Sequence, residues 1–244
     1  MDTKIAQNLQ RIYGGTTADY LTSLKNAMDM EEKKFVITAN AEVLMMAETN
    51  ETIREMLKTE SVSMVPDGIS IVNAMKKFDI PVQERVTGVD LTEGLLRHAG
   101  ENGKTVCLLG ATEEVVRALE AKLRAAYPKM ILECHNGYDG DKDQIFENIK
   151  LQKPDFVVTA LGVPSQELLI YRHYKDFDKG IFIGVGGTFD VLSGLKKRAP
   201  KIFLKTNTEW LYRITREPAR LKRFYNSNIK FMRYLAKEHK TKQG

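Results

Sequence analysis

The sequence has few of the residues that mark disulfide-bonded or metal-binding proteins. Two cysteines and four histidines occur among 244 residues. Cys107 and Cys134 both lie in apolar runs, which predicts buried free thiols rather than a disulfide. The cysteines and histidines show no metal-ligand spacing, so we expect no His/Cys metal site. We also expect no cofactor.

Long apolar runs are also missing. No stretch of about 18 apolar residues occurs, which excludes a helix that spans a bilayer. The N-terminal sequence MDTKIAQNLQ lacks the apolar core of a signal peptide, so the sequence predicts a cytoplasmic protein. Hydrophobic residues still make up 43% of the chain, which is enough for a sizeable buried core.

Charge is distributed unevenly along the chain. From Lys196 onward there are 15 Lys/Arg and 3 Asp/Glu residues, whereas residues 1–195 are net acidic. This asymmetry predicts an α/β domain over residues 1–195 and a basic helical appendage over 196–244. A basic end on an acidic body indicates an anionic partner for that end.

Short apolar runs alternate with longer helical patterns, which predicts an α/β fold. Such alternation favours an open, mostly parallel six-stranded sheet with helices on both faces. Strands are expected at 34–38, 61–65, 104–109, 130–135, 155–160 and 180–185, and helices near 17–29, 41–59, 68–77, 90–101, 112–126, 141–151 and 164–175. Asp90 with Glu93 has the spacing of a capping box, and Thr112 is a candidate N-cap.

Polar residues follow the first two predicted strands, at the edge of the sheet where ligands bind in such folds. Thr38 and Asn40 place a hydroxyl and an amide there. On spacing alone, Asn40 is more simply a helix N-cap than a ligand. Asp67 lies between Pro66 and Gly68. Its position fits two roles equally well: a general base, or a helix N-cap or turn residue.

The remaining strand ends carry glycine-containing turns. The turn at 109–112 has neither G-x-G-x-x-G nor a P-loop Lys-Ser/Thr, so a dinucleotide or Walker-type site has little support. His135 is more simply structural than catalytic, whereas Tyr138 offers a flat face to a base or sugar. Turns after the fifth and sixth strands supply Gln166, Glu167, Gly186, Gly187 and Asp190.

Nine short motifs, in order along residues 34–225, carry a family resemblance. They are TANAEVLMMA, PDGISIV, ERVTGVDL, LLGATEEVV, YP, HNGY, LGVPSQE, GVGGTFDVLSGLKKRAP and EWLYRITREPARLKR. Each alone is moderately specific, but the ordered set resembles the WecG/TagA/CpsF family of glycosyltransferases. The resemblance implies a Rossmann-like fold and an inverting transfer without an essential metal. It also implies a UDP donor of N-acetylmannosamine and an undecaprenyl-diphosphate-GlcNAc acceptor, a step toward wall teichoic acid or a related envelope polymer.

The resemblance also assigns roles to residues. Asp67 matches the proposed base, and Thr38, Asn40, Arg85 and Gln166 match other active-site positions. Donor contacts are expected at Tyr138, Gly186, Gly187 and Asp190, and diphosphate contacts at Arg213, Arg220 and Arg223 of the appendage. The N-terminal 30 residues lack the opening strand of the family; IYGGTTADY resembles it only faintly, so that edge of the sheet is expected to be altered.

The C-terminal segment has two readings. Apolar residues recur at helical spacing among basic ones, as in a helix on an anionic membrane surface. They are Leu221, Phe224, Tyr225, Ile229, Met232, Leu235 and Ala236. The alternative is a helix packed on its own domain or on a second copy of the chain. The first reading places the protein at the inner face of the cell membrane as a peripheral protein.

Competing functions remain open at this point. A nucleic-acid-binding protein is disfavoured, because the body is acidic and no RRM, KH or helix-turn-helix pattern occurs. A nucleotide-binding enzyme of another class, such as a dehydrogenase, is disfavoured because the sequence lacks the G-x-G-x-x-G motif. A transferase for another UDP-sugar such as UDP-ManNAcA, or a non-catalytic relative, fits the same resemblance. The expected partners are therefore a UDP-sugar, a polyprenyl-diphosphate-linked GlcNAc and an anionic membrane surface, with no nucleic acid.

Overall fold

A computed structural model gives the structure of the chain, and it describes residues 4–200, 202–203, 206, 208–216, 221–222 and 225–241. Six strands within these ranges form one sheet in the order β2-β1-β6-β5-β3-β4. They are β1 (Lys33–Ala39), β2 (Val62–Pro66), β3 (Thr105–Gly110), β4 (Ile131–His135), β5 (Phe156–Ala160) and β6 (Gly180–Gly184). Every pairing is parallel, and each strand lies within one residue of its expected range, which confirms the predicted sheet.

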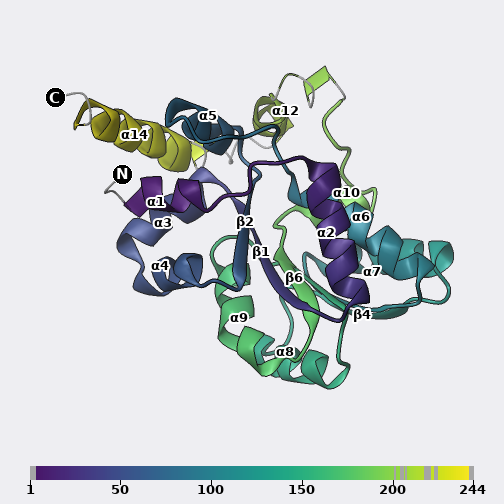
Figure 1. Ribbon diagram of the computed structural model, residues 1–244. Helices are drawn as coiled ribbons and strands as arrows, with labels where there is room; N and C mark the ends of the chain where they lie inside the picture. The colour runs from purple at the N-terminus through teal and green to yellow at the C-terminus, as the bar shows by residue number, and fades with distance from the viewer. Residues whose placement is uncertain are drawn as a thin grey trace.

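Helices cover both faces of the sheet, as predicted (Figure 1). One face packs against α1 (Lys4–Gln10), α3 (Ala41–Thr49), α4 (Glu51–Lys58), α5 (Ile69–Lys77), α8 (Lys142–Leu151), α9 (Ser165–His173) and the 3-10 turn η1 (Tyr174–Asp176). The other packs against α2 (Thr17–Asp29), α6 (Gly88–Glu101), α7 (Glu113–Ala126) and α10 (Thr188–Leu192). The fold is therefore α/β with two apolar layers.

Strand side chains feed the two layers alternately. In β1, Phe35 and Ile37 join the cluster on one face and Val36 joins the cluster on the other. Every residue of the central strands β5 and β6 is buried, as expected of parallel strands covered on both sides. Cys107 and Cys134 are buried free thiols, as predicted, and burial raises the pKa of Cys134 to about 12.

Two local predictions were wrong in detail. The helix expected over 41–59 is divided at Asn50, whose side chain accepts a hydrogen bond from the Ile53 backbone N–H and so begins a new helix. The N-cap of α6 is Thr87 rather than Asp90, because the Thr87 hydroxyl accepts from the Asp90 N–H. The predicted cap at Thr112 is confirmed.

The chain beyond the β2 edge begins with a helix and a single bridge. The helix α1 precedes a single bridge between Ile12 and Met64, where the Tyr13 N–H donates to the Met64 carbonyl at 2.8 Å. One bridge in place of a strand covers part of the β2 edge. Sequence patterning indicated neither α1 nor this bridge.

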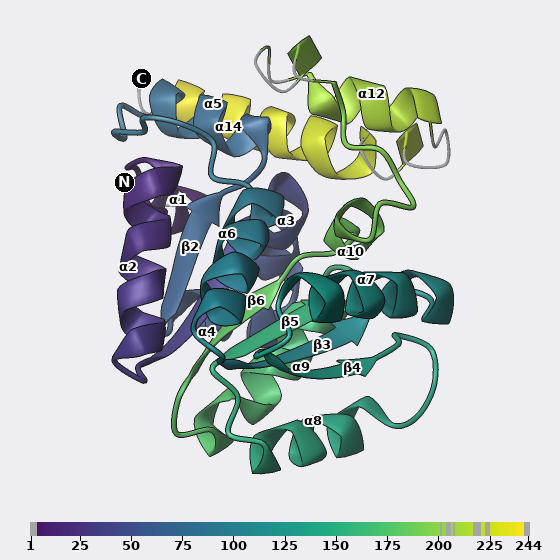
Figure 2. The same cartoon turned by 90° about the vertical axis from the view of Figure 1, so that its right-hand side faces the viewer.

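The C-terminal segment forms α12 (Glu209–Arg216), a π-helical turn η2 (Tyr225–Ile229) and α14 (Lys230–Thr241). Figures 1 and 2 show α14 beside α1 and α5, and the apolar side chains of α14 join the core cluster of that face. Phe231 and Leu235 are fully buried, and the Tyr234 hydroxyl donates to Glu48 at 3.3 Å. Of the two readings, packing on its own domain therefore holds for α14.

The predicted apolar stripe of this segment does not all face the same way. Leu221, Tyr225 and Met232 are exposed, whereas Phe231, which was not in the predicted stripe, is buried. The π-helical turn shifts the residues that follow it around the axis, which a regular helical period does not anticipate. No helix in the described part of the chain is long and apolar enough to cross a bilayer.

Candidate active site

A cavity of about 560 Å³ lies at the carboxyl ends of the strands. Residues that follow all six strands line it, together with the segment before α6 and residues of the C-terminal segment. The chain leaves β3 for β4 on one side and leaves β5 for β6 on the other, although β3 and β5 are neighbours. Such a switch point is where open parallel sheets bind ligands. In Figure 2, α12 lies beyond this end of the sheet.

The structure brings most of the predicted site residues to this cavity. Its lining includes Thr38, Asn40, Asp67, Arg85, Tyr138, Gln166, Gly186, Gly187 and Asp190. Arg213 belongs to α12, but its side chain lies outside what the structure describes, and Arg220 and Arg223 lie outside the described residues.

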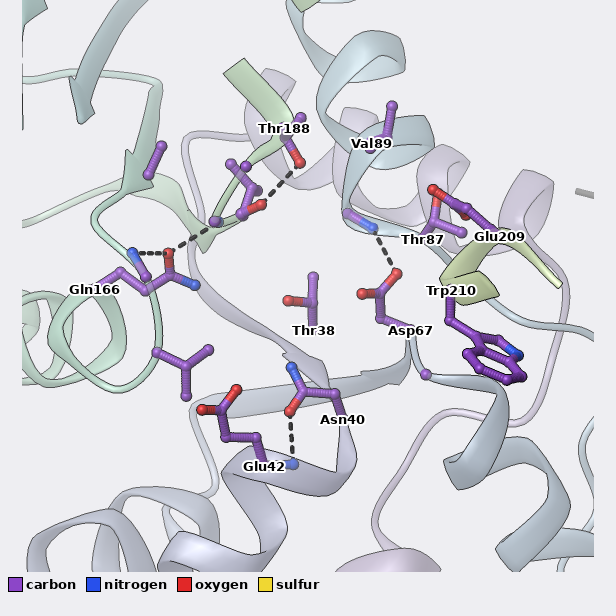
Figure 3. Close-up of a pocket in the computed structure, with 18 of the residues that line it drawn as sticks. Thr38, Asn40, Glu42, Asp67, Thr87, Val89, Gln166, Thr188, Glu209 and Trp210 are labelled. Carbon is purple, nitrogen blue, oxygen red and sulfur yellow. Dashed lines mark hydrogen bonds between the residues drawn. The ribbon is translucent and has the colours of Figure 1, made fainter. Parts of the chain in front are cut away.

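Asp67 follows directly after β2 and points into the cavity (Figure 3). Its carboxylate Oδ1 accepts a hydrogen bond from the Gly88 N–H at 3.3 Å, in the first turn of α6. The N-cap of the following helix is Gly68, without a side-chain cap, so Asp67 does not serve as that cap. An N–H at a helix N-terminus favours a negatively charged partner such as a carboxylate.

Asn40 and Thr38 are held by the backbone next to Asp67. The Asn40 Oδ1 accepts from the Glu42 and Val43 N–H groups at 2.9 and 3.0 Å, so the N-cap reading is correct. Its amide nitrogen remains on the cavity side in Figure 3, which leaves a donor for a ligand. The Thr38 hydroxyl donates to the Gly184 carbonyl at 3.1 Å and ties β1 to β6.

Gln166 joins the two glycine turns of the cavity. Its Oε1 accepts from the Gly162 N–H at 3.1 Å and from the Gly186 N–H at 2.9 Å, and its Nε2 donates to Glu167 at 2.7 Å. Both glycines have positive φ, +80° and +52°, a backbone conformation that other residues rarely adopt. Gln166 is 1% exposed, so its contacts are those of a residue that positions the turns.

The other predicted donor contacts lie at the rim. Tyr138 is 78% exposed, and the Asn136 side chain accepts from its N–H at 2.8 Å, which fixes the turn that carries it. Asp190 lies 3.3 Å from the Lys196 ammonium. Gly187 precedes the first turn of α10. A solvent-facing aromatic ring and a glycine turn are suited to a flat base and a phosphate, respectively.

Arg85 has a partner that sequence reasoning missed. Its Nη2 donates to the Glu209 Oε2 at 2.8 Å, and both side chains are largely buried. Glu209 and the adjacent Trp210 begin α12 and line the cavity. The available signal was an acidic residue next to the chain's one tryptophan, within a segment that is otherwise basic.

A set of groups able to share a cation lies elsewhere. Within the described residues, the one set of three close ligand atoms comes from Glu147, His173 and Asp176. They belong to α8, α9 and η1 and do not line the cavity. The His173 Nε2 is also hydrogen-bonded to Asp143 at 2.7 Å, and Lys150 pairs with Glu147 at 2.6 Å, so protein groups already hold this cluster together. His135 pairs with Glu133 on β4 in the same structural manner.

Comparison with known proteins gives a consistent answer. Residues 8–244 match the profile of the Glycosyl transferase WecG/TagA/CpsF family. A protein of Staphylococcus aureus strain MW2, named N-acetylglucosaminyldiphosphoundecaprenol N-acetyl-beta-D-mannosaminyltransferase, is 38% identical over 204 residues, which is 83% of this chain and 80% of the relative. Proteins of the same name from strains NCTC 8325 and MRSA252 are 38% and 37% identical over the same shares. The chain belongs to the WecG/TagA/CpsF family.

The WecG/TagA/CpsF match places the cavity in a functional context. The matched region includes both the sheet and the C-terminal segment, so Asp67 and Glu209 both lie within it. Members of a glycosyl transferase family need room for a sugar donor and an acceptor together, and the cavity is large and lined by polar groups from both parts.

Proposed function

We propose that the protein transfers N-acetylmannosamine from UDP-ManNAc to undecaprenyl-diphosphate-linked GlcNAc. The product is a β-linked disaccharide lipid, the linkage unit of wall teichoic acid or a related envelope polymer. The observation that carries the proposal is the likeness to the Staphylococcus aureus N-acetylmannosaminyltransferases over 83% of the chain. The cavity, which spans a switch point of the sheet and includes Asp67, is consistent with it.

Inversion at the anomeric carbon assigns a role to Asp67. The acceptor hydroxyl oxygen forms a bond to the anomeric carbon while the bond from that carbon to the UDP oxygen breaks on the opposite face. The Asp67 carboxylate takes the proton that the hydroxyl loses. The Gly88 N–H orients this carboxylate toward the cavity, and Asn40 lies within the same group of side chains.

The departing UDP carries charge that the protein has to stabilise. The turn formed by Gly186 and Gly187 lines the cavity and lets a phosphate approach the backbone closely, although the Gly186 N–H itself already donates to Gln166. Arginines match the geometry of phosphate oxygens, and we assign this role to Arg213, Arg220 and Arg223 of the appendage. The charge of Arg85 is already balanced by Glu209, so Arg85 is the weaker candidate for a direct diphosphate contact.

The acceptor is a membrane lipid, so the protein has to reach a membrane. Exposed apolar residues between Ile202 and Met232, together with the basic residues of the segment, suit the surface of an anionic leaflet. We propose peripheral association with the inner face of the cell membrane. A second copy of the chain remains an expected partner.

The decisive assay supplies UDP-ManNAc and a soluble lipid-diphosphate-GlcNAc analogue to the full chain. We expect UDP release, a β-linked product by NMR, and the same rate with EDTA. UDP-ManNAcA and UDP-GlcNAc serve as competing donors. Preference for UDP-ManNAcA would replace the proposed donor, and loss of activity in EDTA would contradict the metal-independent mechanism. Absence of UDP release with every donor would indicate a non-catalytic relative.

A further inference from the structure

Two ion pairs connect the C-terminal segment to the start of α6. Arg85 of the body pairs with Glu209 of α12, and the side chains are 15% and 6% exposed. In the second pair the charges are reversed: the segment supplies the cation, Arg198, which pairs with Asp90 of α6 at 2.7 Å. Removing one partner of a buried pair leaves an uncompensated charge, so the Arg85–Glu209 pair strongly fixes the first turn of α12.

This connection reaches the proposed base over a short path. Three residues after Arg85, the Gly88 N–H donates to Asp67, so the segment that Glu209 holds is the one that orients the carboxylate. The Asp90 carboxylate, held by Arg198, also accepts from the Thr87 hydroxyl at 2.5 Å. Glu209 is therefore placed to influence catalysis through Arg85.

Trp210 comes directly after Glu209 and lines the cavity. Figure 3 shows its indole next to Asp67, on the side of the cavity away from Gln166. The side chain is 36% exposed, so part of it is covered by the protein and part faces solvent. An indole offers an apolar face to the C–H face of a pyranose and an N–H donor at its edge.

We propose that Trp210 is the contact surface for the acceptor sugar, and that the Arg85–Glu209 pair is the positioning device that holds it beside Asp67. The inference rests on the proposed glycosyl transfer. The acceptor is favoured over the donor because the base has to touch the acceptor hydroxyl, and Trp210 is the aromatic residue next to the base. The proposed donor contacts at Gly186 and Gly187 belong to the turn that Gln166 holds.

The single tryptophan makes binding directly observable. Trp210 is the one tryptophan of the chain, so intrinsic fluorescence of the full-length protein reports on this position alone. We expect a soluble lipid-diphosphate-GlcNAc analogue to change the emission in a saturable manner, and UDP alone to leave it largely unchanged. A response to UDP but not to the acceptor analogue would assign Trp210 to the donor and overturn the proposal.

Steady-state kinetics separate positioning from a general structural role. Glu209→Gln should raise the KM for the acceptor by about tenfold or more while the donor KM changes by less than about twofold. Trp210→Ala should have the same signature, and Trp210→Phe should recover most of it. Glu55→Gln, at an exposed pair with Lys58, is the matched control and should change neither constant.

A charge exchange then tests how Arg85 acts. If the pair positions α12, the double variant Arg85→Glu with Glu209→Arg should regain much of the acceptor affinity that each single variant loses. If Arg85 instead binds the diphosphate, the double variant should bind the acceptor as weakly as Arg85→Glu alone. That result would contradict the positioning role. Should Glu209→Gln fail to fold by circular dichroism, the Trp210→Ala and Trp210→Phe pair decides.

The outcomes keep this inference distinct from the proposed function. The inference alone is overturned if the protein transfers the sugar normally and neither Trp210→Ala nor Glu209→Gln changes the KM for the acceptor. Absence of both transfer and acceptor binding in the unaltered protein overturns the proposed function, and the inference with it.

Discussion

The body and the C-terminal segment differ in how far they bury their large apolar side chains. In the body, the strands β5 and β6 are buried at every position. Of the eleven large apolar side chains that are exposed within the described residues, six lie in the segment. They are Ile202, Trp210, Leu211, Leu221, Tyr225 and Met232. The body thus buries most of its large apolar side chains, whereas the segment leaves several of its own exposed.

The segment is nevertheless attached, and by two different kinds of contact. Phe231 and Leu235 of α14 enter the core cluster of the body, while Glu209 and Arg198 form ion pairs beside the cavity. The described part of the segment is therefore anchored to the body at both ends and carries exposed apolar side chains between them. Variants that affect one contact and not the other can test this division.

The largest expected effect is the loss of the apolar anchor. Phe231→Ala removes a fully buried ring, which should lower the free energy of unfolding by about 3–5 kcal/mol. Met232→Ala, at the adjacent and exposed position, should change it by less than about 0.5 kcal/mol. Urea unfolding of both variants measures the difference. Equal effects at the two positions would contradict the packing of α14 on the body.

The next effect concerns the exposed apolar surface. Ile202→Glu combined with Leu211→Glu should weaken binding to anionic vesicles by about tenfold or more, because charged groups replace two apolar contacts. Met30→Glu combined with Leu151→Glu places the same charges at exposed apolar positions of the body and serves as the control. Co-sedimentation measures binding. The membrane proposal fails if both pairs weaken binding alike.

The smallest effect is a pH dependence of the ion pair beside the cavity. Burial alone would raise the pKa of Asp90, but the Arg198 guanidinium and the Thr87 hydroxyl outweigh it and hold the pKa below its ordinary value. A lowered pKa contributes stability above about pH 4 that is lost as pH falls through the folded-state pKa. Asp90→Asn should therefore be less stable than the unaltered protein at pH 7, by at most about 1 kcal/mol because the pair is partly exposed.

Urea unfolding at pH 7 and at pH 3 checks this expectation. The difference between Asp90→Asn and the unaltered protein should shrink at the lower pH, where Asp90 is increasingly protonated. A difference that is the same at both values would show that the Asp90 charge is not its source.

The sheet could be predicted from the sequence because its determinants are local. Short apolar runs separated by helical patterns indicate buried parallel strands, and each strand lies within one residue of its expected range. The break at Asn50 was missed because helix lies on both sides of it, and the cap at Thr87 because Asp90 with Glu93 has the spacing of a capping box. The orientation of α14 was missed because the π-helical turn before it shifts the periodicity.

The candidate site could be predicted only in part. Residues directly after strands, such as Asp67 and Asn40, are brought together by the topology of a parallel sheet, so their positions follow from the fold. The Arg85–Glu209 pair joins residues 124 apart, and no local pattern indicates it. The hydrogen bonds of Gln166 to two glycine turns likewise depend on backbone geometry that appears only in the folded chain.

The central claim is that Asp67 is the base of an inverting glycosyl transfer. The most direct test compares kcat for Asp67→Asn with that of the unaltered protein, using UDP-ManNAc and the soluble lipid-diphosphate-GlcNAc analogue. The amide oxygen of the variant can still accept from the Gly88 N–H, so the cavity should keep its shape. The account predicts a fall in kcat of about 10²–10⁴-fold with KM values little changed. Activity retained within a few-fold would contradict it.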